Sequence, residues 1–207
     1  MKLVRILVLI LALAVNAAVS AAEIPSPTKV IENFHAVLLR VMKEAKSLAA
    51  KERYTKLEPA IVTAFDLGFM IRVASGTAWR KASDEHKSQL TKAFRRMSIA
   101  TYAFRFKGYS GQRFETLKIS EGPRRTKLIH TQIVSPPKNK EKREQVVKLS
   151  YVTKQFKGKW KIVDVLLDGG ISELSVKHSE YRTTLKTKGA GRLATILDKK
   201  ADQLIAD

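Results

Sequence analysis

The spacing of apolar residues predicts helices over the first half of the chain. Ser26-Pro27 is a typical helix start, because serine caps free N–H groups and proline suits the first turn. Beyond it, apolar residues recur every three or four positions to about residue 50. The same signals predict a short helix from Pro59, a helix over 67–74 capped by Asp66, and a long helix over 84–107 capped by Ser83.

After residue 108 the apolar period changes from that of helices to that of strands. Strand-like runs follow at 113–120, 125–134, 145–156 and 159–167, with Lys157-Gly158 as a two-residue hairpin turn between the last two. Short connections between consecutive strands favour an antiparallel meander. Two helices, at about 171–187 and 190–205, close the chain. The pattern predicts an α+β fold in which a helical layer packs on a four-stranded antiparallel sheet.

The last of these strands is apolar on both of its faces. Simple alternation places Trp160, Ile162 and Leu166 on one side and Val163, Val165 and Leu167 on the other. A sheet with one face in water alternates apolar with polar residues instead. We therefore expect both faces to be covered, by helices or by something apolar that the sheet holds.

Residues 1–22 have the character of an export signal. Lys2 and Arg5 precede an apolar run over 6–15, and small residues at 17–22 suit a signal peptidase. The run is about half of the ~20 residues that a membrane span needs. We expect residues 1–22 to be a signal peptide, residues 23–207 to form a single domain, and the mature protein to be a periplasmic monomer. The chain has no cysteine, which excludes disulfides and an acylated cysteine.

The chain is strongly basic, with 39 Lys and Arg against 19 Asp and Glu and a formal net charge of +20. Such a balance attracts polyanions. Behind an export signal we expect no nucleic acid, so phospholipid head groups and acidic partner proteins remain. The charge run at 138–144 is interpreted as a solvated loop or, alternatively, as a basic finger with Arg124, Arg125 and Lys127 near its base.

Residues that could carry catalysis or bind a metal are sparse. The four histidines are scattered, and no Gly-x-Ser-x-Gly elbow is present. We predict no catalytic residue and no metal site. Asp164 and Asp168 resemble a carboxylate pair, but four strand residues separate them by about 13 Å, beyond the ~5–9.5 Å of glycosidase pairs. We expect Asp168 to cap the following helix and Asp164 to meet a basic neighbour.

Bulky apolar residues are more numerous than a core of this size requires. They crowd residues 65–79 and 94–106 and both sides of the strand at 145–156. Each one alone is typical of an ordinary core, and together they are enough to line a cavity as well. The pattern alone leaves both outcomes open.

Three stretches of the chain resemble the MlaC family, also called the toluene-tolerance auxiliary or phospholipid-binding family. They are Phe-Asp-Leu-Gly-Phe-Met at 65–70 with the block at 76–83, Tyr-Ser-Gly-Gln-Arg-Phe at 109–114, and residues 160–182 with Ser-Glu-Tyr-Arg at 179–182. The resemblance covers nearly all of the mature chain. The sequences Gly-Tyr-Ser-Gly at 108–111 and Val-Asp-Val-Leu-Leu-Asp at 163–168 are similar to those of the hopanoid-associated HpnM branch of this family.

The resemblance implies a soluble periplasmic carrier with an apolar lipid cavity between the helices and the sheet. It implies phospholipid or hopanoid as cargo, with no other cofactor. The implied partners are an inner-membrane lipid transporter, either an MCE-domain complex or a hopanoid permease, and an outer-membrane donor or acceptor complex. We predict that apolar residues contact the lipid tails: Phe69, Met70, Val73, Trp79, Phe94, Met97, Val147, Leu149, Tyr151, Val165, Leu167, Ile171, Leu174 and Tyr181.

Two other functions are consistent with the residues. The first is an interaction module with the same fold and a solid core, which uses its basic surface to tether a membrane or a protein. The second is a hydrolase that depends on one of the histidines. A dry apolar cavity distinguishes the carrier from the module.

Overall fold

The computed structural model describes residues 25–137, 143–168 and 170–206. The expected signal peptide, most of the charge run at 138–144 and Gly169 lie outside the described residues. No helix within these ranges is both long and apolar enough to cross a membrane.

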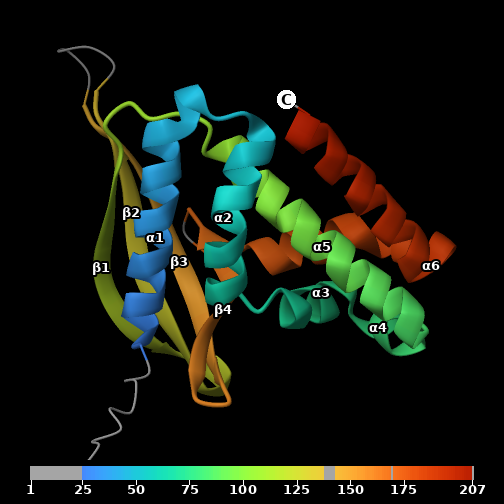
Figure 1. Ribbon diagram of the computed structural model, residues 1–207. Coiled ribbons are helices and arrows are strands. Elements are labelled where there is room, and N and C mark those ends of the chain that lie inside the picture. Colours follow the sequence, from blue (N-terminus) through green and yellow to red (C-terminus); the bar gives the residue numbers. More distant parts are fainter. Residues whose placement is uncertain (1–24, 138–142, 169, 207) are drawn as a thin grey trace, which may run out of the picture.

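Helices α1–α5 precede the sheet and α6 follows it (Figure 1). The helices are α1 (Pro27–Glu44), α2 (Ala50–Ala64), α3 (Leu67–Ser75), α4 (Thr77–Lys81), α5 (Asp84–Arg105) and α6 (Glu173–Ala206), with short 3₁₀ turns η1 (Ala45–Ser47) and η2 (Pro123–Arg125). The strands are β1 (Arg113–Gly122), β2 (Thr126–Ser135), β3 (Gln145–Phe156), β4 (Lys159–Leu167) and β5 (Ile171–Ser172).

The predicted caps of α1, α3 and α5 are confirmed by hydrogen bonds. Ser26, Asp66 and Ser83 each accept a backbone N–H three residues on. The expected start of α2 at Pro59 was wrong, because Pro59 lies inside a helix that begins at Ala50. The Glu52 carboxylate accepts the Ala49 N–H at 2.7 Å, which satisfies a free donor at the true start.

The last helix has a break at the position that the sequence indicates. α6 is continuous by hydrogen bonding, but Gly189 has φ 76° and ψ 179°, far from helical values. Only glycine adopts such a conformation without strain. The two predicted closing helices are therefore the two halves of α6.

The sheet has the order β1-β2-β3-β4-β5, and every pairing is antiparallel. This confirms the predicted α+β architecture and the meander. The fifth strand is a small addition, in which Ile171 and Ser172 pair with Leu167 and Leu166.

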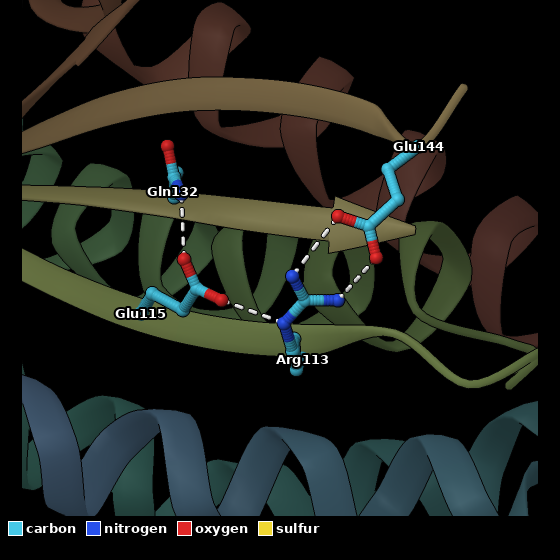
Figure 2. A network of polar contacts seen from close by, with 4 residues as sticks. All are labelled: Arg113, Glu115, Gln132 and Glu144. Atoms are coloured by element: carbon cyan, nitrogen blue, oxygen red, sulfur yellow. Dashed lines mark hydrogen bonds and ion pairs between the residues drawn. The ribbon is translucent and has the colours of Figure 1, made fainter. Parts of the chain in front are cut away.

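The helices cover one face of the sheet only (Figure 1). Cross-strand partners such as Ile129–Tyr151 and Thr131–Leu149 share the helix-facing side. On the other face, Arg113 donates to both carboxylate oxygens of Glu144 and to Glu115, and Gln132 donates to Glu115 (Figure 2). A polar network of this kind is typical of a face in contact with water. The expectation that both faces are covered was wrong.

A β-bulge explains this error. Thr153 pairs with Ile162 and Val152 pairs with Asp164, so Val163 is an extra residue in β4. A bulge shifts the alternation of side chains by one position. As a result Ile162, Val165 and Leu167 all belong to the core under the helices, whereas simple alternation separates Ile162 from the other two.

The turn with Arg124 and Arg125 lies at the start of β2, and the charge run follows the end of β2. Ten residues of strand separate the two ends by about 30 Å. The suggestion that these arginines lie near the base of a basic finger at 138–144 was therefore wrong.

Candidate functional site

An apolar cavity of about 200 Å³ lies between the sheet and the helices. The sheet contributes side chains from β2, β3 and β4, and the helices contribute side chains from α3, α5 and the start of α6. The lining residues are Phe65, Leu67, Met70, Phe94, Met97, Ser98, Thr101, Tyr102, Arg105, Phe106, Ile133, Val147, Leu149, Tyr151, Val165, Leu167, Glu173 and Lys177.

The sheet side of the cavity follows from the period of a strand. Val147, Leu149 and Tyr151 are alternate residues of β3 and share one face. Val147 is 44% exposed, whereas Leu149 and Tyr151 are buried. The cavity therefore becomes deeper along β3, from an open end near Val147 to a closed end at Tyr151.

Tyr151 is fixed at the closed end by a buried histidine on α1. Its hydroxyl and His35 Nε2 are 2.8 Å apart. The imidazole also stacks on Phe114, with ring centroids 4.4 Å apart. Burial lowers the pKa of His35 to about 4 and raises that of Tyr151, so both groups are neutral near neutral pH. The deepest polar atoms of the cavity wall are thus paired and uncharged.

Aromatic rings at the C-terminal end of α5 and directly after it form part of the helical wall. Tyr102 and Phe106 are one turn apart and stack at 5.8 Å with an angle of 11° between the rings. Behind them, Phe34 makes edge-to-face contacts with Phe65, Tyr102 and Tyr151. Met70 and Met97 line the cavity as well, and their flexible thioethers adapt to the shape of a neighbour.

Charged residues gather at the rim. Arg105 at the end of α5 and Glu173 at the start of α6 form an ion pair, with Nη1 and Oε1 3.5 Å apart. Lys177 lies one turn along α6 with its Nζ 6.0 Å from the centre of the Phe94 ring. The Arg105 side chain is 60% exposed. The rim therefore offers two cations at the edge of an apolar hollow.

The start of α6 is held in place by Asp164 of β4. The Asp164 carboxylate accepts the Leu174 N–H at 3.1 Å and the Ser172 hydroxyl at 2.5 Å. The expected roles of the two aspartates were wrong. Ser172 caps α6 by accepting the Ser175 N–H at 3.0 Å, Asp164 supports this cap from β4, and Asp168 lies in the preceding turn with φ 29°. The bulge in β4 brings Asp164 to this position.

Eight of the predicted tail-contact residues line the cavity: Met70, Phe94, Met97, Val147, Leu149, Tyr151, Val165 and Leu167. Six do not. Phe69 packs against Phe156. Trp79 and Tyr181 belong to the core or its margin. Val73 and Leu174 line a separate small hollow, and Ile171 is 59% exposed. Contact with lipid remains a prediction for all fourteen, and the cavity brings eight of them together.

Sequence reasoning missed Ile133 on β2, several residues of the helical wall and all of the charged rim. Tyr102 and Phe106 carried a usable signal, because they follow Phe94 and Met97 at helical spacing. Arg105, Glu173 and Lys177 carried none, since one charged residue among many has no distinguishing pattern.

His130 is the histidine to consider for the hydrolase hypothesis, because it meets two serine hydroxyls. Its two ring nitrogens are each 2.8 Å from a serine hydroxyl, of Ser120 and of Ser150. In this arrangement no carboxylate orients the imidazole, as catalytic triads require. Within residues 25–137, 143–168 and 170–206, no group of acidic or histidine side chains has the spacing to hold a metal ion.

Comparison with solved structures places this fold beside a lipid-binding protein. The phospholipid-binding protein from Ralstonia solanacearum, solved in complex with a phospholipid, superposes with a TM-score of 0.68 at 17% sequence identity. The match covers 86% of this chain and 95% of that one. None of the curated protein sequences matches the chain. The family model described as MlaC protein matches residues 32–199, and the chain therefore belongs to the MlaC family.

Proposed function

We propose that this protein is a periplasmic lipid carrier that holds lipid tails in the cavity and moves phospholipid or a hopanoid between the inner and outer membranes. The observation that carries the proposal is the apolar cavity between the helices and the sheet. Membership of the MlaC family and the phospholipid bound to the Ralstonia protein of the same fold support it.

The physical need for a carrier follows from the hydrophobic effect. Exposing one methylene to water costs about 0.8 kcal/mol. Two acyl chains carry about thirty methylenes in total, so exposing both chains costs on the order of 20 kcal/mol. A free lipid crosses water slowly for this reason. A protein that surrounds the tails removes most of this barrier without any catalytic group.

The size of the cavity requires movement on loading. Its volume of about 200 Å³ is below the ~300–1,000 Å³ of pockets for drug-sized ligands. A lipid with two acyl chains is larger still. Loading therefore requires the cavity to expand, and we propose that α5 and the start of α6 move away from the sheet while Met70 and Met97 adapt to the cargo.

The rim suits an anionic head group. Arg105 and Lys177 present donors at the opening, where a phosphate stays in water while the tails enter. Glu173 pairs with Arg105 and thereby holds the guanidinium at the rim. A hopanoid without a phosphate gains nothing from these cations, so the rim favours phospholipid of the two cargoes.

The signal-like residues 1–22 are the support for a periplasmic location, and the proposed partners are a membrane transporter on one side and an outer-membrane complex on the other. The competing hypothesis, an interaction module, was formulated with a solid core. The cavity weighs against that form of it.

Transfer of lipid between two vesicle populations tests the proposal. Donor vesicles with a labelled phospholipid and unlabelled acceptor vesicles are separated by a membrane that the protein crosses and vesicles do not. We expect label to reach the acceptors in proportion to the protein added. Equal transfer with and without the protein contradicts the shuttle.

A further inference from the structure

Two turns at the same end of the sheet form a basic surface away from the cavity. One turn joins β1 to β2 and contains Arg124 and Arg125, and the other joins β3 to β4 and contains Lys157. The pairing of Thr126 with Lys154 places them side by side, at the lower end of the sheet in Figure 1. We call Arg124, Arg125, Lys127, Lys154, Lys157 and Lys159 together the basic tip.

The backbone of the basic tip is strained in a way that glycine or asparagine would relieve. Arg124, Arg125 and Lys157 have φ values of 56°, 59° and 47°. Only one other described non-glycine residue, Asp168, has a positive φ. Two-residue hairpin turns favour Asn and Gly because they adopt this conformation readily, and strained positions of this kind gather at functional sites. Arginine and lysine occupy these positions although they strain the backbone of the turns, which indicates that their charge has a function.

Aromatic rings lie among the cations. Lys127 Nζ is 5.8 Å from the centre of the Trp160 ring, and Lys154 Nζ lies at 5.8 and 5.9 Å from Phe69 and Phe156. A hollow between the two turns is lined by Glu121, Arg124, Arg125, Lys127, Lys154, Gln155 and Trp160. Its one acidic neighbour, Glu121, pairs with Lys127 at 3.2 Å.

We propose that the basic tip docks the protein on an anionic lipid surface. Phosphate groups of the bilayer meet the guanidinium and ammonium groups, one of them in the hollow, and Trp160 reaches the level of the head groups. Lys and Arg are attracted to anionic lipid, and tryptophan is enriched at the membrane interface.

The shape of the tip favours a lipid surface over an acidic protein as its partner. The two turns project together from the end of the sheet (Figure 1), so a plane of phosphates meets Arg124, Arg125 and Lys157 at the same time. All three side chains are exposed. A protein partner with carboxylates at fixed positions is expected to engage directed, paired donors. Long, exposed side chains on two neighbouring turns suit mobile head groups better.

The basic tip is separate from the lipid cavity. The basic tip uses residues 154–159 of the β3–β4 hairpin, and the cavity uses Val147, Leu149 and Tyr151 of the same strand nearer its start. A variant that loses docking but keeps its cargo is altered at the basic tip alone. A variant that loses its cargo but still docks is altered at the cavity alone.

The decisive variant removes charge and relaxes the turn together. Arg124→Asn with Arg125→Gly installs the residues that the turn prefers, so the fold is expected to remain stable. The matched control is Lys186→Gln with Lys188→Gln, which removes two exposed charges from α6. Each protein is floated with vesicles of phosphatidylglycerol and phosphatidylethanolamine, and with neutral phosphatidylcholine vesicles, at low and at high salt.

We expect the unmodified chain to bind only the anionic vesicles and to be released by salt. Each cation at the surface strengthens binding about fivefold, so the tip variant should lose more than tenfold in affinity and the control less than twofold. In a Trp79→Phe background, Trp160 is the single tryptophan, and its emission should shift to the blue on anionic vesicles. Equal losses in the two variants, or no binding of the unmodified chain to anionic vesicles, would overturn the proposal.

Discussion

His35 on α1 and Tyr151 on β3 are joined by a buried hydrogen bond of 2.8 Å across the interface between the helices and the sheet. The bond fixes the closed end of the cavity, because the Tyr151 ring lines it. Removal of either partner leaves a polar group in an apolar environment, which is more costly than loss of the bond itself.

Replacement of Tyr151 by Phe should destabilise the protein by about 1–3 kcal/mol, since His35 then keeps its buried nitrogen without a partner. Urea unfolding followed by circular dichroism measures the change. Ser110→Ala, in an exposed turn, is the control. Thr153→Val on the same strand is unsuitable as a control, because the Thr153 hydroxyl donates to the Lys127 carbonyl. A Tyr151→Phe midpoint equal to that of the unmodified chain would refute the role of this bond.

The stability of the protein should fall between pH 6.5 and pH 4. Burial lowers the pKa of His35 from 6.5 to about 4. As pH falls through 6.5 the unfolded chain takes up a proton at this imidazole, and the folded chain does so only near pH 4. The loss over the window is on the order of 3 kcal/mol. The free energy of unfolding of His35→Gln should change less with pH over the same range. If it changes with pH as steeply as that of the unmodified chain, His35 is not the cause of the pH dependence.

Asp164 should matter more for stability than Asp168. Asp164→Ala removes the acceptor for the Leu174 N–H and the Ser172 hydroxyl, which should cost about 1–3 kcal/mol. Asp168→Ala is the matched control. Thermal unfolding of both variants measures the difference. If Asp168→Ala is the more damaging of the two, Asp164 is not the residue that anchors α6.

A bulky side chain inside the cavity should exclude the cargo. Ser98 lines the cavity from α5, and Ser98→Trp places an indole in the space. Lys92→Trp adds the same ring to an exposed position of the same helix. Lipid extracted from the purified proteins should fall at least fivefold in Ser98→Trp and stay constant in Lys92→Trp. Equal lipid content in both would show that the cargo binds elsewhere.

The rim cations should select for anionic lipid. Replacement of Arg105 and Lys177 by Gln should weaken retention of phosphatidylglycerol about tenfold, because two exposed charge contacts contribute ~1–2 kcal/mol together. Retention of an uncharged lipid should change little. Competition between the two lipids for the purified protein measures the ratio, and an unchanged ratio would remove these residues from head-group recognition.

Local signals predicted most of the fold. The caps at Ser26, Asp66 and Ser83 and the change of period after residue 108 are properties of neighbouring residues, so they are readable from the sequence. The start of α2 was missed because proline is common in the first turn of a helix, so Pro59 was interpreted as the start. Tertiary packing instead extends this helix on the N-terminal side of Pro59, to Ala50.

The site was less predictable, because it depends on contacts between distant elements. The bulge at Val163 depends on the pairing of β3 with β4, and it changed both the faces of β4 and the role of Asp164. Phe69 and Ile171 are as apolar as Met97, and only the packing of α3 and β5 places them outside the cavity. Apolar character alone does not distinguish a core position from a cavity wall.

Native mass spectrometry of the protein purified without detergent is the most direct test of the central claim, a cavity that takes up lipid tails. The account predicts a population heavier than the bare chain by the mass of one lipid, which is released on denaturation and is absent from Ser98→Trp. A chain that has the bare mass alone, and keeps it after incubation with phospholipid vesicles, would contradict the account.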